Sequence, residues 1–249
     1  MQNRREESII VTGGARGIGA EIVKLCSQAG YDVCFTFQQQ HDAARRLLEL
    51  CQTHTGKVVA LQADVSDASK RDAVFDAANK LSPLRGLVNN AGITSVIGRF
   101  EHVEEATIRH VFEINVMGTM LMSQHAIRYW LQHNQAGNIV NVSSIAAKTG
   151  SPNEYVHYAA SKAAVESFTV GLAKEVAAQR IRVNAVSPGI TRTDIHALSG
   201  EPDRATRIAR KIPMQRAAEA SEIAAAVAWL LSPASSYMTG AIVPVAGGL

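Results

Sequence analysis

Tyr158 and Lys162 are the two residues of this sequence whose types and spacing most directly suggest chemistry. They lie four positions apart at the start of an apolar, helix-forming segment, and four residues make about one helical turn. Both side chains therefore emerge on the same face of the expected helix. A neighbouring ammonium group favours phenolate and lowers the pKa of a tyrosine from its usual value of about 10. Such a pair suits proton exchange with an alcohol or a carbonyl compound.

A glycine-rich turn follows the first apolar run of the chain. Residues 8–11 are predicted to form a strand, and residues 12–19, which read TGGARGIG, lead from it into a helix near residues 18–29. Glycines allow the backbone to approach a pyrophosphate, whose charge is stabilised by the positive end of the helix. A glycine-rich match alone is weak, but its place between strand and helix favours a dinucleotide site.

Apolar runs typical of buried strands alternate with helix-period segments along the whole chain. This alternation predicts an α/β fold: a single doubly wound Rossmann-type domain over residues 1–249, with helices on both faces of a mostly parallel seven-stranded sheet. We expect Ser66 to cap the third helix. The expected strands are residues 8–11, 33–37, 57–61, 86–89, 138–142, 181–186 and 241–245, and the two longest expected helices are residues 107–132 and 155–178.

The segment from about residue 191 to residue 220 breaks this rhythm. It is polar, contains several arginines and holds Gly200-Glu201-Pro202 and Pro213. Because it follows the C-terminal end of a strand, where α/β folds bind ligands, we expect an inserted substrate lid. A packed pair of surface helices is the alternative.

Three further short motifs follow predicted strands. They are Asn89-Asn90-Ala91-Gly92, Ser143-Ser144 and Pro188-Gly189. Each one alone is typical of an ordinary turn or helix cap. Because the C-terminal ends of parallel strands share one rim of the sheet, we expect these motifs to converge on a single site.

In this combination and order, the motifs resemble those of the short-chain dehydrogenase/reductase family over nearly the whole chain. The resemblance rests on the glycine turn, Asn89-Asn90-Ala91-Gly92, Asn115, Ser144 with Tyr158 and Lys162, and Pro188-Gly189 leading to Thr193. It implies NAD(P)-dependent oxidation of alcohols or reduction of carbonyl compounds.

The resemblance also implies a role for each catalytic residue. Tyr158 would be the proton donor or acceptor, and Lys162 would hold the nicotinamide ribose and depress the pKa of Tyr158. Ser144 would hydrogen-bond the substrate oxygen, and Asn115 would anchor a water on a proton path to Lys162. Without the family pattern, Asn115 would be interpreted as an amide on a helix surface.

The family pattern assigns the cofactor to residues spread along the chain. Asp64 would contact the adenine, and Thr193 would contact the carboxamide or the phosphates. The full implied set is Gly13, Arg16, Gly17, Ile18, Gly19, Asp64, Val65, Asn90, Ala91, Gly92, Tyr158, Lys162, Pro188, Gly189 and Thr193.

Two placements near the catalytic helix stay open. Ser144 lies fourteen residues before Tyr158 and Ser143 fifteen, whereas thirteen is frequent in the family, so either serine is a candidate for the substrate oxygen. His157 adjoins Tyr158, yet on a helix it points about 100° away, and contact with the substrate is the alternative.

The residues after the second strand bear on the choice of nicotinamide cofactor. NAD sites usually place an acid there on the ribose 2′-hydroxyl. Residues 36–41 read TFQQQH, with no acid before Asp42, and Arg16 is a charge-assisted donor for a 2′-phosphate. We therefore predict NADP(H) over NAD(H).

Composition narrows the class of protein further. The chain has 249 residues, of which 47% are hydrophobic, and a formal net charge of +3 with scattered basic residues, so we expect no nucleic-acid partner. No secretory or membrane-spanning run is visible, and three unpaired cysteines fit a reducing cytoplasm. The eight dispersed histidines favour no metal site, which argues against a metal-dependent dehydrogenase.

Three questions remain at this stage: activity, assembly and substrate. The alternative to an enzyme is a catalytically inactive nucleotide sensor or scaffold on the same fold. The family resemblance implies a homotetramer or homodimer formed through the two long helices, which are apolar beyond one stripe. The alternative is that all of this surface faces the core of the same chain. The substrate is a small molecule that the sequence does not specify, because residues 94–99, 146–155 and 191–214 would form its walls as loops.

Overall fold

The computed structural model describes residues 5–249, apart from the side chains of Ala68, His196 and Leu198, so residues 1–4 of the predicted domain lie outside it. Its main feature is a seven-stranded, fully parallel sheet in the order β3-β2-β1-β4-β5-β6-β9. The predicted α/β fold and its parallel seven-stranded sheet are confirmed. The strands are β1 (Ser8–Val11), β2 (Asp32–Phe37), β3 (Val58–Gln62), β4 (Leu84–Asn89), β5 (Gly137–Val142), β6 (Ile181–Pro188) and β9 (Ile242–Val245).

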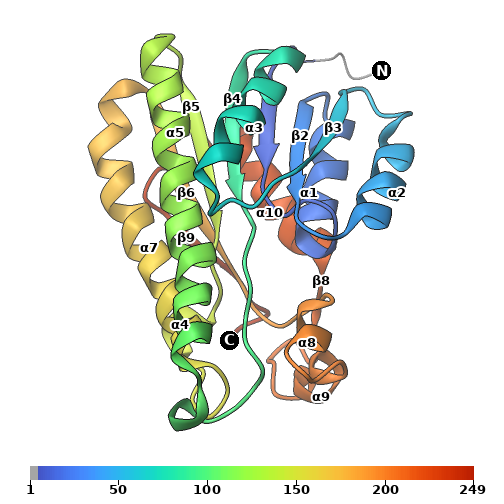
Figure 1. Ribbon diagram of the computed structural model, residues 1–249, viewed down its shortest axis with the longest axis vertical. Coiled ribbons are helices and arrows are strands. Elements are labelled where there is room, and N and C mark those ends of the chain that lie inside the picture. Colours follow the sequence, from blue (N-terminus) through green and yellow to red (C-terminus); the bar gives the residue numbers. More distant parts are fainter. Residues whose placement is uncertain (1–4) are drawn as a thin grey trace.

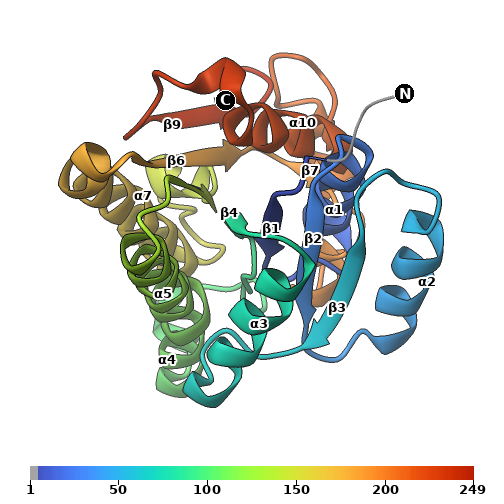
Figure 2. The same ribbon diagram turned by 90° about the horizontal axis from the view of Figure 1, so that it is seen from above.

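Helices cover both faces of the sheet, as Figure 2 shows from above. Helices α1 (Gly17–Gln28), α2 (His41–Cys51) and α10 (Ala220–Leu231) bury their apolar side chains on one face. Helices α3 (Ala68–Leu81), α5 (Thr119–Gln132) and α7 (Val156–Val176) do so on the other. The central strands are buried from both sides, which explains why they appear in the sequence as continuous apolar runs.

Two local predictions were wrong. Asp67, and not Ser66, caps α3, because its carboxylate accepts the backbone N–H of Ser69 while Ser66 bonds Asp64. The long helix expected over residues 107–132 is divided into α4 (Glu105–Phe112), a π-helical turn (Glu113–Gly118) and α5. An apolar period near 3.6 does not distinguish an α-helix from one that contains a single wider turn.

The segment after β6 projects beyond the C-terminal ends of the strands (Figure 1). It contains β7 (Thr191–Arg192), α8 (Ile195–Leu198), α9 (Arg204–Ala209) and β8 (Ala218–Glu219). Strands β7 and β8 pair in parallel, so the two ends of the insertion lie side by side. Short helical turns complete the chain: η1 (Phe100–His102), α6 (Ala146–Thr149), η3 (Ala177–Gln179) and η4 (Pro233–Ser235).

Candidate active site

A cavity of about 560 Å³ lies at the C-terminal edge of the sheet. It is where the strand order reverses between β1 and β4, the position at which open α/β sheets bind their ligands. Every cofactor-binding residue predicted above lines this cavity, together with Ser143 and Ser144. Of the predicted catalytic residues, Ser144, Tyr158 and Lys162 line the cavity, whereas Asn115 does not.

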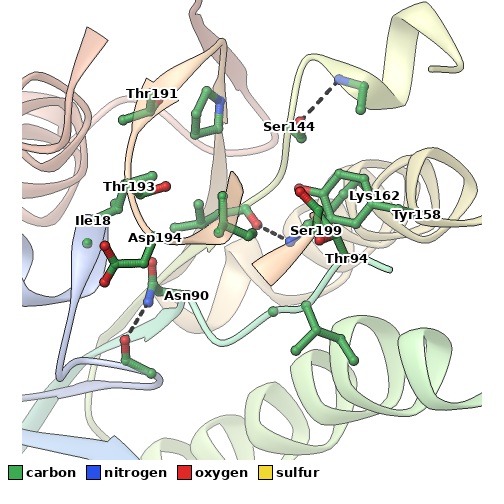
Figure 3. A pocket seen from close by; sticks show the side chains of 18 of the residues that line it. Ile18, Asn90, Thr94, Ser144, Tyr158, Lys162, Thr191, Thr193, Asp194 and Ser199 are labelled. Carbon is green, nitrogen blue, oxygen red and sulfur yellow. Dashed lines mark hydrogen bonds between the residues drawn. The ribbon is translucent and has the colours of Figure 1, made fainter. Parts of the chain in front are cut away.

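Tyr158 and Lys162 lie on the first turns of α7, where that helix meets the end of β5. Their exposed fractions are 8% and 5%. The Lys162 ammonium donates to the backbone oxygen of Val142 at 2.9 Å and lies 5.7 Å from the centre of the Tyr158 ring. Figure 3 shows both side chains beside Ser144 at one end of the cavity, with Asn90 and Ile18 at the other.

The glycine turn has the geometry of a phosphate cradle. Gly13 and Gly17 adopt left-handed backbone angles, φ 63° and 53°, that other residues rarely tolerate. A Cβ at Gly13 would lie 3.0 Å from the Cα of Ala91, and one at Gly19 would lie 2.3 Å from the oxygen of Gly13. A backbone this close, at the N-terminus of α1, fits a dinucleotide pyrophosphate.

Hydrogen bonds join the glycine turn to the motif after β4. The Asn90 amide donates to the backbone oxygens of Thr12 and Gly13 at 2.9 and 3.0 Å. The Thr12 hydroxyl in turn accepts the backbone N–H groups of Asn90 and Ala91. Thr12 was not among the predicted site residues, since a hydroxyl that bonds only to backbone leaves no distinct mark in a sequence.

Comparison with known proteins agrees with this geometry. Residues 13–249 match a family model described as enoyl-(acyl carrier protein) reductase. An uncharacterized oxidoreductase of Escherichia coli (strain K12), YgfF, is 46% identical over 96% of this chain and 98% of its own. The chain belongs to the short-chain dehydrogenase/reductase family.

Two further relatives of this short-chain dehydrogenase/reductase have more specific names. Glucose 1-dehydrogenase 2 of Bacillus subtilis (strain 168) is 32% identical over 98% of this chain and 94% of its own length. L-xylulose reductase of Caenorhabditis elegans is 35% identical over 98% of this chain and 95% of its own. The chain is therefore an oxidoreductase that acts on CH–OH or C=O groups with a nicotinamide cofactor.

Burial is the largest cause of the pKa shifts of Tyr158 and Lys162. It raises the pKa of Tyr158 above the usual value of 10.0, and a hydrogen bond from Ser144 opposes this only in part. Burial also lowers the pKa of Lys162 from 10.5 to about 8. Lys162 is not among the groups that shift the pKa of Tyr158 in the chain by itself, so the expected lowering by the ammonium stays a prediction.

The two candidate serines after β5 face different partners. The Ser143 hydroxyl donates to the Glu166 carboxylate at 3.0 Å and to the backbone oxygen of Lys162 at 3.3 Å. Ser144 hydrogen-bonds Tyr158 and accepts the backbone N–H of Ala146 at 3.2 Å. Ser144 thus lies beside the Tyr158 phenol, whereas Ser143 is bonded to α7.

Asn115 lies in the π-helical turn and is fully buried, which excludes a surface amide. Its side chain accepts the backbone N–H of Ile93 and donates to the Ile93 oxygen and to the Ser161 hydroxyl. It therefore ties the chain after β4 to α7. A Cβ at Gly92 would lie 3.2 Å from the Lys162 ammonium and 3.3 Å from the Asn115 amide oxygen, so a glycine allows these groups to approach.

At the end of β2, the Gln38 amide donates to Asp64 at 2.7 Å. The other Asp64 oxygen accepts the backbone N–H and the hydroxyl of Ser66. Arg16 lines the same part of the cavity, and no ion pair of Arg16 is found among residues 5–249. This rim therefore combines the Arg16 cation with the Gln38 amide and the Asp64 carboxylate that accepts from it.

At the end of the cavity near Tyr158, several lining residues come from segments that the sequence predicted only as wall-forming ranges. Thr94, Glu154, Tyr155, Ser199 and Arg204 line the cavity there, from the three segments expected to form its walls. Nothing in their spacing distinguishes them from other loop residues. His157 is buried but does not line the cavity.

Proposed function

We propose that this short-chain dehydrogenase/reductase is an NADP(H)-dependent enzyme that interconverts a carbonyl compound and a secondary alcohol. The single observation that carries the proposal is the arrangement of Ser144, Tyr158 and Lys162 at one end of a cavity whose other end is the glycine turn. When bound, the dinucleotide would supply or accept the hydride. Side chains of the protein would transfer the proton and stabilise charge on the substrate oxygen.

Tyr158 would transfer the proton to and from the substrate oxygen. Its raised pKa keeps the phenol protonated at neutral pH, which suits donation to a carbonyl oxygen during reduction. Ser144 would hydrogen-bond the same oxygen and stabilise charge that builds there. Lys162 would hold the nicotinamide ribose, with its ammonium fixed by the Val142 oxygen.

Replacing Tyr158 with phenylalanine tests the proposal. The variant keeps the ring but loses the proton, so turnover should fall by about 10²–10⁴-fold while NADPH affinity stays within about threefold. Steady-state kinetics and NADPH fluorescence titration measure the two quantities. A Tyr237→Phe variant is the matched control, because it removes the hydroxyl of an exposed tyrosine that does not line the cavity. Wild-type rates in Tyr158→Phe would show that the mechanism is wrong.

The cofactor preference rests on the rim formed by Arg16 and the Gln38–Asp64 pair. A 2′-phosphate would meet the Arg16 guanidinium, and no acid in residues 36–41 repels it. Arg16→Ala should weaken NADPH binding about tenfold or more and NADH binding by about twofold or less, since a bond to a charged group is lost only for NADPH. Isothermal titration with each cofactor checks this. Equal or tighter NADH binding by the wild type would contradict the preference.

The substrate is best sought with a panel. The relatives are named for glucose and L-xylulose, and the cavity wall combines apolar side chains with the polar Thr94 and Ser199. We propose to measure NADPH oxidation with L-xylulose, diacetyl, an acetoacetyl thioester and a 3-ketosteroid, and NADP⁺ reduction with D-glucose. Turnover of any one separates an enzyme from a nucleotide-sensing scaffold.

Three broader features belong to the same proposal. Residues 191–220 would act as the substrate lid, since both of their ends are joined at the C-terminal edge of the sheet. The chain would assemble as a homotetramer or homodimer through the helices at residues 107–132 and 155–178. It would work in the cytoplasm, which its three free cysteines suit. None of the helices in the described part of the chain is long and apolar enough to cross a membrane.

A further inference from the structure

Arg204 is a buried arginine in the inserted segment, on α9. Its side chain is 5% exposed, and its two terminal nitrogens donate to the two carboxylate oxygens of Glu154 at 2.8 and 2.6 Å. Glu154 belongs to the loop between β5 and α7, fifty residues earlier in the chain. A two-pronged pair of this kind fixes orientation as well as distance.

The Arg204 guanidinium is linked to Tyr158 by contacts with the ring of Tyr155, which lies between them. Its central carbon lies 5.5 Å from the centre of the Tyr155 ring. The Tyr155 ring meets the Tyr158 ring edge to face, with 5.3 Å between their centres. Arg204, Tyr155 and Tyr158 thus form a packed row from the inserted segment to the reacting hydroxyl, and all three line the cavity.

Backbone contacts follow the same route between the walls of the cavity. The N–H of Ile97 donates to the oxygen of Ser199, and the N–H of Gly98 donates to the oxygen of Glu154. The loop before Glu154 is strained, because Ser151 and Asn153 have φ of 44° and 61° without being glycines. Such backbone persists when surrounding contacts hold it in place, and the two-pronged Arg204–Glu154 ion pair is a contact of this kind at the loop.

We propose that Arg204 is a positioning residue for the reaction: through Glu154 and Tyr155 it holds the inserted segment over the cavity and fixes the orientation of Tyr158. The inference rests on the proposed function, in which Tyr158 transfers the proton. A buried ion pair is by itself weak support for a stabilising role, because the cost of removing both charges from water offsets their attraction. Its place between the inserted segment and the reacting phenol is what indicates a role in positioning.

Glu154→Gln is the main test, since it removes one charge and leaves every trypsin site of the inserted segment intact. With the panel carbonyl that the wild type reduces fastest, we expect KM to rise about tenfold or more and kcat to fall, because the wall and the phenol lose their fixed geometry. NADPH affinity should change by about threefold or less. Trypsin should cleave at Arg207, Arg210 and Lys211 about tenfold faster.

Two other variants complete the design. Arg204→Lys keeps the charge but not the two-pronged contact, so its KM and cleavage rate should lie between those of the wild type and Glu154→Gln. Glu105→Gln is the control, because it breaks an exposed ion pair with Arg109 on α4. It should match the wild type in all readouts. If Glu154→Gln fails to fold, Arg204→Lys gives the same comparison.

Wild-type KM, kcat and cleavage rate in Glu154→Gln and Arg204→Lys would overturn the proposal. A lower melting temperature with unchanged KM, kcat and cleavage would also overturn it, since the pair would then contribute stability only. Failure of the proposed function would give a different result from failure of the positioning role. A wild type that binds NADPH but turns over no panel compound would remove the enzymatic interpretation, and the trypsin comparison would still decide whether the pair holds the segment.

Discussion

At the scale of single residues, burial favours the uncharged forms of both Tyr158 and Lys162. It raises the pKa of Tyr158 and lowers that of Lys162 to about 8. The phenol is therefore ready to donate a proton at neutral pH, while the ammonium is close to losing its own. A protonated phenol suits donation of a proton to a carbonyl oxygen, which is the step that the proposed function assigns to Tyr158 during reduction.

The lowered pKa of Lys162 predicts that binding of the nicotinamide cofactor depends on pH. The ammonium is present below about pH 8 and is lost above it, and an anionic dinucleotide favours the charged form. We expect NADPH affinity to fall by about threefold to tenfold between pH 7 and pH 9. Fluorescence titration of NADPH across this range measures it.

Lys162→Arg is the control for this pH dependence. Arginine keeps its charge throughout the range, so the variant should show no weakening between pH 7 and pH 9, whatever its absolute affinity. A wild type whose NADPH affinity stays constant to pH 9 would show that Lys162 does not titrate near pH 8.

At the scale of elements, sequence patterns determined which segments form strands and helices, but not how single turns are built. The glycine turn, the motif after β4 and the Tyr158–Lys162 spacing are local, and local spacing is visible in a sequence. The π-helical turn that holds Asn115 was not visible, because one extra residue in a turn leaves the apolar period almost unchanged. The partners of Arg204 were also hidden, since a contact across fifty residues depends on the packing of two loops.

The strained loop between β5 and α7 yields a prediction at this scale. Asn153 has φ of 61°, which asparagine tolerates and a β-branched residue does not. Asn153→Val should lower the free energy of unfolding by about 1–2 kcal/mol and raise the KM for the carbonyl substrate, because Glu154 follows directly. Urea unfolding and steady-state kinetics measure the two effects.

Asn134→Val is the matched control for Asn153→Val. Asn134 also has a left-handed backbone, with φ of 50°, but it lies after α5, at the opposite end of that helix from the cavity. It should lose similar stability with an unchanged KM. Equal KM values in the two variants would show that the loop before Glu154 does not shape the substrate site.

At the scale of the whole molecule, strand order explains why distant motifs meet. The glycine turn follows β1, Asn90 follows β4, Ser144 follows β5 and Pro188 ends β6, and these four strands are neighbours in the sheet. Because all run in parallel, their C-terminal ends share one edge, and the cavity lies there. The order of the motifs in the sequence therefore predicts that they meet at this edge of the sheet. The residues that the inserted segment contributes to the cavity wall could not be predicted in this way.

The proposed assembly of several copies of the chain can be tested by a substitution at Gly171. This glycine is exposed in the middle of α7, where a glycine costs about 1 kcal/mol relative to alanine. A Cβ there would meet no atom within 4 Å among the described residues, so packing within the chain does not require a glycine. Close approach of a second copy of the chain along α7 would require one.

Gly171→Leu should therefore shift the assembly to a smaller particle, measured by size-exclusion chromatography with light scattering. Glu49→Leu, on the exposed face of α2, should leave the assembly unchanged. A monomeric wild type, or a Gly171→Leu variant of wild-type mass, would show that α7 is not an interface between copies.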